Sequence, residues 1–250
     1  MRLIQADPSA ASSPARSTER DRPPLRVGLV QHRWRPDAAA LKGVLHDAVG
    51  QAAGAGAAVV FLPELTLSRY PADERARPGC ADETTEDLTA GPTFAFAARA
   101  AREHGVHVHA SLFERSPGED GLGLNTAILL APTGELVTRT RKLHIPVTAG
   151  YHEDTYFRPG PAQDPYPVTR VPGLQDVRLG LPTCWDQWFP EVARAYSLAG
   201  AEVLAYPTAI GSEPAFPSFD TQPLWRHVIV GNGITAGTFM VVPNLSLIHI

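Results

Sequence analysis

The sequence predicts an α/β domain in which strands and helices alternate along the chain and pack in layers. Short apolar runs that are typical of buried strands, such as residues 57–62, alternate with stretches whose apolar residues recur at helical spacing, such as 41–52. The chain has 250 residues, 44% of them hydrophobic, so one domain can bury a full core. Its two cysteines, Cys80 and Cys184, are too few for a disulfide framework.

The first predicted elements follow a stretch without a helix or strand pattern. Residues 1–24 are rich in Ser, Ala, Pro and Arg without apolar periodicity, which predicts a disordered leader. A strand is expected over 25–31, and Asp37 stands where it can cap the helix that contains residues 41–52. Glycines end this helix, and the strand 57–62, expected to be buried on both faces, comes next.

The same alternation continues to the end of the chain, with long irregular stretches between some elements. Helices are expected over 94–102, 190–199 and 224–234, and strands over 106–112, 125–130, 136–140, 177–181 and 203–206. The stretches 68–91, 146–172 and 208–221 are rich in Pro, Gly and acidic residues. Structureless segments of this length are usually functional in a compact domain.

The charge balance and hydropathy exclude several classes of partner. A net charge of -4 provides no basic field to attract nucleic acid. No apolar run reaches the roughly 20 residues that span a bilayer, and the N-terminus lacks the order of a secretory signal. We expect a cytoplasmic protein whose partners are small molecules or other subunits.

Three reactive side chains each follow a predicted strand. Glu64, Lys142 and Cys184 come after the strands 57–62, 136–140 and 177–181. In layered α/β folds the carboxyl ends of strands face the ligand crevice, so the three can converge there. A thiol needs a base to become a nucleophile, and Glu64 can serve as that base. Lys142 and the backbone N–H of Trp185 can stabilise the negative charge of a tetrahedral intermediate.

Each of these residues also has an ordinary structural interpretation. A cysteine in an apolar run is commonly an inert core residue. A glutamate after a strand can cap a helix or lie in a loop. Lys142 stands beside Arg139 and Arg141, and such clusters are commonly solvated. Composition and spacing therefore leave both interpretations open.

Longer motifs carry a resemblance to a known family. The segment Cys184-Trp-Asp-Gln-Trp-Phe-Pro-Glu191 resembles the nucleophile segment of the N-carbamoylputrescine amidases of the nitrilase superfamily. Arg141-Lys-Leu-His-Ile-Pro146 is similar to the lysine segment of that group, and Leu62-Pro-Glu-Leu65 to its glutamate segment. The resemblance extends over residues 25–244, which we interpret as one carbon-nitrogen hydrolase domain.

The resemblance implies a fold, a mechanism and an assembly. The fold would be a four-layer αββα sandwich of the nitrilase type, with no metal and no organic cofactor. Cys184 would be the nucleophile of a thioester mechanism, Glu64 the general base and Lys142 the stabiliser of the tetrahedral intermediate. Glu153 matches a second glutamate near the triad, whose role is either proton transfer or orientation. A homo-oligomer built from a dimer is expected.

The chain departs from the family pattern in three places. Pro182 and Thr183 precede the nucleophile, and a proline inside a strand removes one ladder hydrogen bond, so we expect an altered elbow. Gly231-Asn232-Gly233 stands where relatives often carry Gly-His-Ala. Residues 245–250 do not resemble the usual continuation, so we expect an atypical or truncated end with weak activity.

Several residues are candidates for the substrate pocket. Trp185 and Trp188 follow the nucleophile and can line an apolar pocket or pack in the core. Glu114 and Asp186 can meet a cationic amine, or serve as surface and cap carboxylates. The histidines at 104, 107 and 109 have no Cys or carboxylate at ligand spacing, so we expect ordinary packing there and no metal.

The function that these features favour is hydrolysis of an N-carbamoyl amine such as N-carbamoylputrescine, with release of ammonia and carbon dioxide. Two alternatives remain. One is another hydrolase, either an aliphatic or omega-amidase or an N-carbamoyl-amino-acid hydrolase. The other is an inactive truncated scaffold that only binds a ligand.

Overall fold

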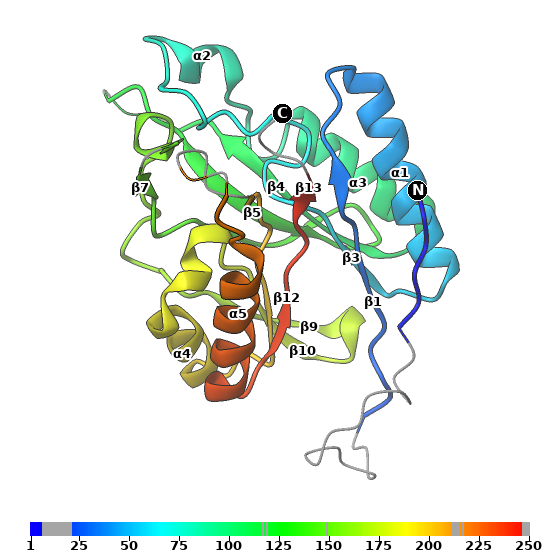
Figure 1. Ribbon diagram of the computed structural model, residues 1–250. Helices are drawn as coiled ribbons and strands as arrows, with labels where there is room; N and C mark the ends of the chain where they lie inside the picture. The colour runs from blue at the N-terminus through cyan, green and yellow to red at the C-terminus, as the bar shows by residue number, and fades with distance from the viewer. Residues whose placement is uncertain are drawn as a thin grey trace.

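A computed structural model shows the arrangement of the chain (Figure 1). The structure describes residues 1–6, 22–116, 118, 120–148, 150–211, 216 and 218–246. Most of the expected leader, residues 7–21, lies outside the described part. Residues 1–6 and 22–26 are described and form neither helix nor strand.

The first sheet has five strands in the order β1-β3-β4-β5-β6, and two helices cover one of its faces. The strands β1, β3 and β4 are parallel, whereas β5 is antiparallel to both of its neighbours. Leu45 and Val49 of the first helix pack with Val60 and Val108 of the sheet. The elements are β1 (Val27–Leu29), β3 (Val59–Phe61), β4 (His107–Glu114), β5 (Leu124–Leu130), β6 (Leu136–Arg141), α1 (Ala38–Gly54) and α3 (Pro92–His104).

The second sheet has four strands in the order β12-β11-β10-β9, and two further helices lie on its outer face. The strands β10, β11 and β12 are parallel, and β9 is antiparallel to β10. Val192 and Tyr196 of one helix pack with Leu204 of the sheet. The elements are β9 (Val168–Val171), β10 (Val177–Gly180), β11 (Val203–Ala205), β12 (Phe239–Val241), α4 (Pro190–Leu198) and α5 (Gln222–Ala236).

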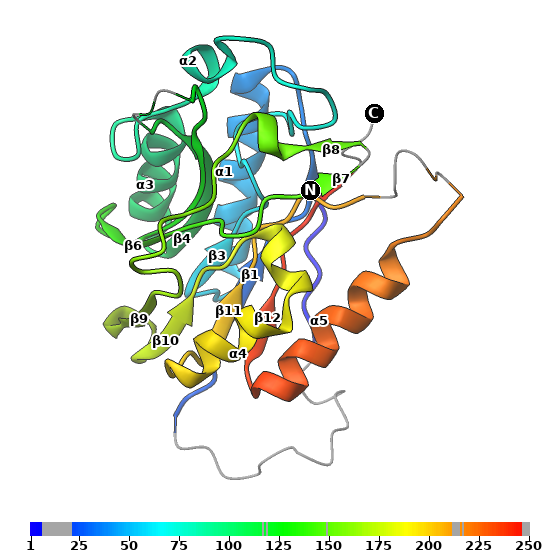
Figure 2. The ribbon, with the colours of Figure 1, turned by 90° about the vertical axis from the view of Figure 1, so that its left-hand side faces the viewer.

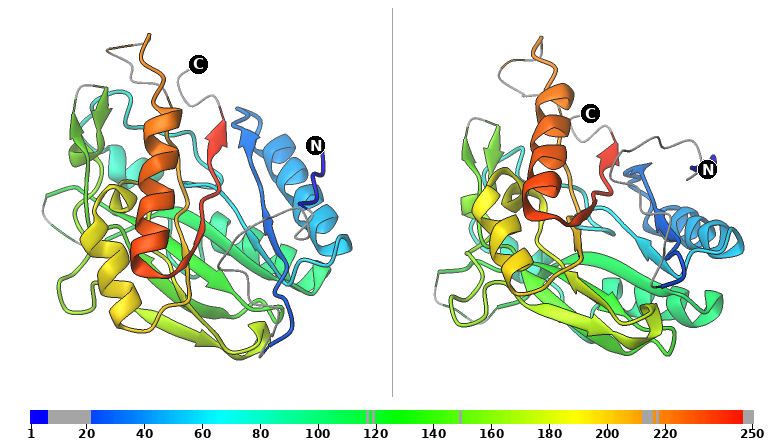
Figure 3. Two further views of the ribbon diagram at one scale, coloured as in Figure 1. Left: turned by 60° about the horizontal axis from the view of Figure 1, so that its bottom comes forward. Right: turned by 90° about the horizontal axis from the view of Figure 1, so that it is seen from below.

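The two sheets pack face to face. Phe61 and Leu129 of the first sheet share a buried cluster with Val171, Leu179 and Val203 of the second. Helix pairs therefore lie on the two outer sides (Figures 2 and 3). The layer order is helix, sheet, sheet, helix, which confirms the predicted αββα sandwich.

Helix α1 shows how local sequence builds one of these layers. The side-chain Oδ1 of Asp37 accepts hydrogen bonds from the backbone N–H groups of Ala39 at 2.8 Å and Ala40 at 3.0 Å, as an N-cap residue does. The helix buries one stripe against the first sheet. That stripe consists of Leu41, Leu45, Ala48, Val49 and Ala52.

The stretches expected to be irregular contain short elements. The segment 68–91 includes α2 (Cys80–Thr84), and the segment 146–172 includes β7 (Val147–Thr148), β8 (Tyr151–His152) and the edge strand β9. A two-residue strand carries no periodicity that a sequence could reveal. β2 (His32–Arg33) was also unpredicted; it pairs in parallel with β13 (Leu245–Ser246), which falls in the segment expected to be atypical.

The predicted disturbance at Pro182 does not occur in the form expected. Strand β10 ends at Gly180, so the proline follows the strand and removes no ladder hydrogen bond. The chain then turns into a 3-10 helix, η4 (Cys184–Trp188). In the described part of the chain, none of the helices combines the length and apolar character needed to cross a bilayer.

Candidate active site

The three reactive residues predicted from the sequence lie beyond the carboxyl ends of their strands. Glu64 follows β3, Lys142 directly follows β6, and Cys184 follows β10 and begins η4. Their strands belong to both sheets, so the site forms where the two halves of the sandwich meet. This position agrees with the rule that ligands bind at strand ends of layered α/β folds.

A buried ammonium group joins two carboxylates. Lys142 Nζ donates hydrogen bonds to Glu64 Oε1 at 3.1 Å and to Glu153 Oε2 at 2.6 Å. The side chains of all three residues are at most 1% exposed, so no bulk water screens these contacts. The structure thus brings Glu64, Lys142 and Glu153 together, although Glu153 lies on a separate 3-10 helix, η2 (Glu153–Thr155).

The charges in this group influence one another strongly. Burial by itself would lower the pKa of Lys142, but the carboxylates of Glu153 and Glu64 raise it above its ordinary value, so the ammonium stays charged. Burial, together with the charge of Glu64, raises the pKa of Glu153, and Lys142 opposes that rise. The cation is therefore what allows two carboxylates to share one small volume.

Cys184 lies in the same electrostatic environment. Its residue is 6% exposed, and burial followed by the charge of Glu64 raises the pKa of its thiol, whereas Lys142 lowers it. Its backbone φ of +40° lies in the left-handed region, which is uncommon for a residue with a side chain. Its N–H donates to the carbonyl of Pro207 at 3.0 Å. These surroundings favour the neutral thiol over the thiolate, so an attack by Cys184 would require a base.

Glu64 has one oxygen free to act as that base. Oε1 accepts from Lys142 and from Asn125 Nδ2, the latter at 2.8 Å. Oε2 is buried and has no hydrogen-bond partner among the described residues. An unpartnered carboxylate oxygen in a buried site can take up a proton, because nothing competes for its lone pairs.

Neighbouring strands fix the turn that carries Glu64. The N–H of Leu65 donates to Ser111 Oγ at 3.2 Å, and the N–H of Thr66 donates to the carbonyl of Ser111 at 2.9 Å. Ser111 N–H in turn donates to Thr66 Oγ1 at 3.0 Å. Leu65 has a positive φ of 47°, so these bonds hold a backbone conformation that is otherwise unfavourable.

Sequence reasoning missed two polar residues of this network. Asn125 bonds Glu64, and the hydroxyl of Tyr70 donates to Glu153 Oε1 at 2.8 Å. Asn125 stands in a predicted strand and Tyr70 in a long loop, so neither lay in a motif that indicated a site. The one available signal was a polar side chain within an otherwise apolar strand at 125.

Glu114 lies among protein partners and not in an open pocket. Arg141 Nε donates to its Oε2 at 2.8 Å, Thr126 Oγ1 donates to the same oxygen at 2.6 Å, and Arg141 also bonds Oε1. The residue is 5% exposed. Because Arg141 directly precedes Lys142, this ion pair anchors the end of β6.

Asp186 is also occupied by protein groups. Its oxygens accept N–H bonds from Thr183, Leu143 and His144, and the residue is fully buried. Neither Glu114 nor Asp186 therefore presents an open carboxylate oxygen to a cationic substrate. The amine-binding role that we expected for either residue gains no support from this geometry.

The two tryptophans after the nucleophile are half-buried and contact each other. The rings of Trp185 and Trp188 lie 5.9 Å apart. Helix α5 holds this segment, because Trp225 Nε1 donates to Gln187 Oε1 and Asn232 Nδ2 donates to the carbonyl of Gln187, both at 2.8 Å. Asn232 belongs to the triplet that departs from the family pattern, and its amide stabilises η4.

The three long loops meet beside the site. Tyr70, Tyr151 and Ala209, one from each loop, belong to a single buried cluster that also contains Leu65 and Phe113. This packing brings described residues of all three loops together next to Leu65, the neighbour of Glu64. The loops can therefore shape the space above the reacting groups.

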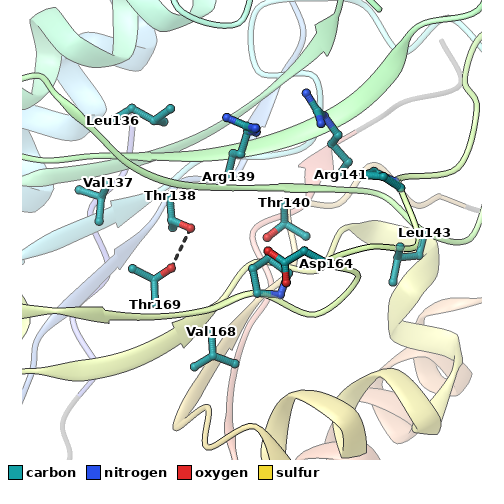
Figure 4. Close-up of a pocket in the computed structure, with 12 residues that line it drawn as sticks. Leu136, Val137, Thr138, Arg139, Thr140, Arg141, Leu143, Asp164, Val168 and Thr169 are labelled. Atoms are coloured by element: carbon teal, nitrogen blue, oxygen red, sulfur yellow. Dashed lines mark hydrogen bonds between the residues drawn. The ribbon is translucent and has the colours of Figure 1, made fainter.

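An open groove of about 540 Å³ lies elsewhere, between the edge strands β6 and β9 (Figure 4). Its lining includes Thr138 and Thr169, whose hydroxyls are hydrogen-bonded at 2.8 Å, and Asp164. Glu64, Lys142 and Cys184 do not line it. Within the described residues, no group of three His, Cys, Asp or Glu side chains is arranged to hold a metal ion.

Comparison with known proteins agrees with the fold. The crystal structure of a carbon-nitrogen hydrolase from Helicobacter pylori G27 matches with a TM-score of 0.76 and 30% identity, covering 88% of this chain and 73% of that one. An amidase from Nesterenkonia sp. AN1 in complex with acrylamide matches with a TM-score of 0.70 and 26% identity, covering 88% and 76%. That amidase is described as a nitrilase-superfamily protein. The fold and its buried site thus define a protein of the nitrilase superfamily.

Within that superfamily the chain belongs to the carbon-nitrogen hydrolase family, whose model matches residues 26–247. A citrullinase from Francisella tularensis subsp. tularensis is 32% identical over 208 residues, which cover 83% of this chain and 69% of the relative. An N-carbamoylputrescine amidase from Solanum tuberosum is 40% identical over 141 residues, covering 56% and 44%. The match therefore spans less than half of the plant enzyme.

Proposed function

We propose that the protein hydrolyses the carbon-nitrogen bond of an N-carbamoyl amine through a covalent intermediate on Cys184. The observation that carries this proposal is a buried Lys142 bonded to Glu64 and Glu153 at once, with the Cys184 thiol in the same charged environment. A nucleophile, a base and a fixed positive charge are the groups that acyl transfer requires.

The first half-reaction forms the covalent intermediate. Glu64 Oε2 accepts the thiol proton while Sγ of Cys184 attacks the carbamoyl carbon. The resulting oxyanion lies against the Lys142 ammonium and the backbone N–H of Trp185. Glu64 then passes its proton to the departing nitrogen, and ammonia leaves. The product is a thioester-type carbamoyl adduct on Cys184.

The second half-reaction releases the product. Glu64 takes a proton from water, and the hydroxide attacks the same carbon through a second oxyanion. The carbon-sulfur bond breaks, and the sulfur recovers a proton from Glu64. The carbamic acid that leaves then breaks down to the free amine and carbon dioxide, so all atoms of substrate and water are accounted for.

Lys142 and Glu153 have separable roles in this scheme. Lys142 supplies oxyanion stabilisation on the order of 3 kcal/mol, the usual size of one such donor. Both oxygens of Glu153 already accept hydrogen bonds, from Lys142 and from Tyr70. This arrangement favours an orienting role for Glu153 over proton transfer, because a proton-transfer group needs a free oxygen near the substrate.

The names of the relatives support the carbamoyl group as the recognised unit. One is an N-carbamoylputrescine amidase and the other a citrullinase, and both named compounds carry a carbamoyl group on an aliphatic amine. N-carbamoylputrescine is the first candidate substrate. Citrulline is the second, because the citrullinase match covers 83% of this chain.

An ammonia-release assay tests the proposal. The panel contains N-carbamoylputrescine, citrulline, an N-carbamoyl α-amino acid and simple aliphatic amides, with Cys184→Ala as the blank. We expect turnover of a carbamoyl compound that the variant lacks. Turnover of simple amides alone would establish an amidase, and no turnover with any substrate would support the binding-scaffold alternative.

A further inference from the structure

Asp186 forms the densest set of hydrogen bonds near the nucleophile. Oδ2 accepts from the N–H of Thr183 at 3.0 Å and lies 3.4 Å from that of Leu143. Oδ1 accepts from the N–H of His144 at 2.9 Å and pairs with His144 Nδ1 at 2.8 Å. The residue is 0% exposed, so protein N–H groups replace water as the hydrogen-bond donors to this carboxylate.

These partners flank two of the reacting groups. Thr183 directly precedes Cys184, and Leu143 directly follows Lys142. One carboxylate therefore connects the backbone that carries the sulfur with the backbone that carries the ammonium, across 42 residues of sequence. Cys184 also has the unfavourable φ of +40°, which surrounding bonds must maintain.

We propose that Asp186 is a positioning residue, which sets the sulfur of Cys184 relative to the ammonium of Lys142 by linking the two backbone segments. The proposal deepens the proposed function and rests on it. Asp186 acts through these backbones and does not contact the substrate.

The aromatic ring of His144 strengthens the same link. It stacks on Phe189, with ring centroids 3.7 Å apart and an interplanar angle of 15°. Phe189 is the residue at which η4 ends and α4 begins. His144 thus ties η4 to the lysine segment at two places, at Asp186 in the middle of η4 and at Phe189 just past its end.

A substrate-binding role for Asp186 makes different predictions. A substrate ammonium could reach the carboxylate only by displacing N–H donors that already occupy both oxygens. If Asp186 bound the amine, its loss would weaken binding of cationic substrates and leave neutral ones unaffected. If it positions the backbone, the chemical step slows equally for both.

Steady-state kinetics of Asp186→Asn separate these roles. In the asparagine variant an NH2 group replaces one of the two acceptor oxygens. That group faces backbone N–H donors and cannot accept from them, so part of the link between the two segments is lost. We expect kcat to fall on the order of 100-fold for a cationic and a neutral substrate alike, the usual effect of misplacing a reacting group by about 1 Å. The ratio of the two KM values should stay unchanged. A loss confined to the cationic substrate would overturn the proposal.

Asp37→Asn is the matched control for this substitution. Asp37 also accepts two backbone N–H bonds, as the cap of α1, and it plays no part in the site. We expect this variant to keep the wild-type kcat, which shows that losing a capping carboxylate is not enough to slow the reaction.

Alkylation of Cys184 by iodoacetamide provides a readout that needs no substrate. Peptide mapping by mass spectrometry, which separates the Cys184 adduct from that of the second free cysteine, Cys80, follows the rate across pH 6–9 in wild type, Asp186→Asn and Asp37→Asn. We expect slower alkylation, on the order of tenfold, and a shifted pH profile for Asp186→Asn alone. A wild-type profile in that variant would refute positioning, even if the proposed substrates prove wrong.

His144→Ala keeps the test decisive if Asp186→Asn does not fold. This variant removes the ring bond and the stacking but retains the backbone N–H bonds of Leu143 and His144. We expect a smaller slowing of alkylation, by a few-fold. An unchanged rate and pH profile would contradict the proposed link.

Discussion

A single ammonium group balances two carboxylates at the centre of the protein. Taking Lys142, Glu64 and Glu153 out of water costs several kcal/mol per ion, and their mutual attraction offsets that cost only while all three are present. Such a group contributes little to stability but holds charges ready where a reaction needs them. The buried charges that the proposed reaction needs therefore add little to the stability of the fold.

Removing the cation should therefore destabilise the fold. In Lys142→Met two buried carboxylates lose their counter-charge, and we expect the free energy of unfolding to fall by about 3–5 kcal/mol at pH 7.5. Lys142 lowers the pKa of Glu153, so its loss raises that pKa further. A carboxyl group whose pKa is higher in the folded than in the unfolded state makes the free energy of unfolding fall as pH rises. The difference in this free energy between wild type and Lys142→Met should therefore be smaller at pH 5 than at pH 7.5. Urea denaturation at both pH values measures this, and a deficit that is constant with pH would contradict it.

A buried histidine should make the stability of the core depend on pH. Burial lowers the pKa of His109 to about 3, and neither ring nitrogen has a hydrogen-bond partner among the described residues. Above pH 6.5 the ring is neutral in both states; below it only the unfolded state takes up the proton. Stability should then fall by roughly 1 kcal/mol for each pH unit.

The variant His109→Leu isolates this contribution. Between pH 7.5 and pH 5, urea denaturation should show a smaller loss of stability in the variant than in wild type, by roughly 1–2 kcal/mol. His227→Gln, at an exposed residue of α5, should retain the wild-type dependence. If the free energy of unfolding changed equally with pH in wild type and in His109→Leu, the histidine would not be buried as a neutral ring.

At the scale of elements, strand ends made most of the site predictable. Glu64, Lys142 and Cys184 each follow a strand that was predicted from the sequence, and the carboxyl ends of strands converge in a layered fold. Asn125 and Tyr70 could not be predicted, because their roles depend on which strand and which loop pack beside Glu64 and Glu153. Those contacts are tertiary, and the one local sign of them is the polar side chain of Asn125 in an otherwise apolar strand.

The long elements were predictable for a similar reason. The apolar stripe of α1 and its cap Asp37 encode the helix locally. Strand β9 lies in a Pro-rich stretch and is defined by its antiparallel pairing with β10, so residues 146–172 looked irregular. The strand β12, which follows α5 after two residues and pairs with β11, was not predicted from the sequence.

The packing of α4 on the second sheet depends on one glycine. A Cβ atom at Gly180 of β10 would lie 2.5 Å from the ring of Tyr196 on α4. We expect Gly180→Ala to lower the free energy of unfolding by about 1–3 kcal/mol, because the helix must move away from the sheet. Thermal unfolding monitored by circular dichroism measures the change.

Gly43→Ala is the matched control, because a Cβ atom there meets nothing within 4 Å. Gly43 lies inside α1, where alanine is the better helix former, so this variant should be more stable than wild type by about 0.5–1 kcal/mol. If Gly180→Ala were as stable as Gly43→Ala, the close packing of α4 on β10 would be wrong.

At the scale of the whole molecule, apolar side chains remain exposed on the outer layer of the second sheet. Leu198 on α4 is 79% exposed, Ile234 on α5 is 75% exposed and Phe239 on β12 is 76% exposed. Large apolar side chains that are exposed in a single chain are the kind that a contact between subunits covers. The homo-oligomer expected from the family resemblance stays a prediction, and its interface would bury such side chains.

A charge on this layer should therefore weaken self-association. We expect sedimentation velocity to show a dimer or a larger oligomer for wild type and a smaller species for Ile234→Lys, because a desolvated ammonium opposes an apolar interface. Leu29→Lys, at an exposed residue of β1 in the other sheet, serves as the control and should sediment like wild type. A monomeric wild type would contradict the expectation.

The proposed reaction requires that the buried cysteine, lysine and glutamates act as one covalent site. Rapid quenching of the turnover of a carbamoyl substrate, followed by intact-mass spectrometry and peptide mapping, tests it most directly. We predict a transient carbamoyl adduct that maps to Cys184 and is absent from Cys184→Ala, which should also lack turnover. Steady turnover without any adduct, together with full activity of Cys184→Ala, would contradict the account.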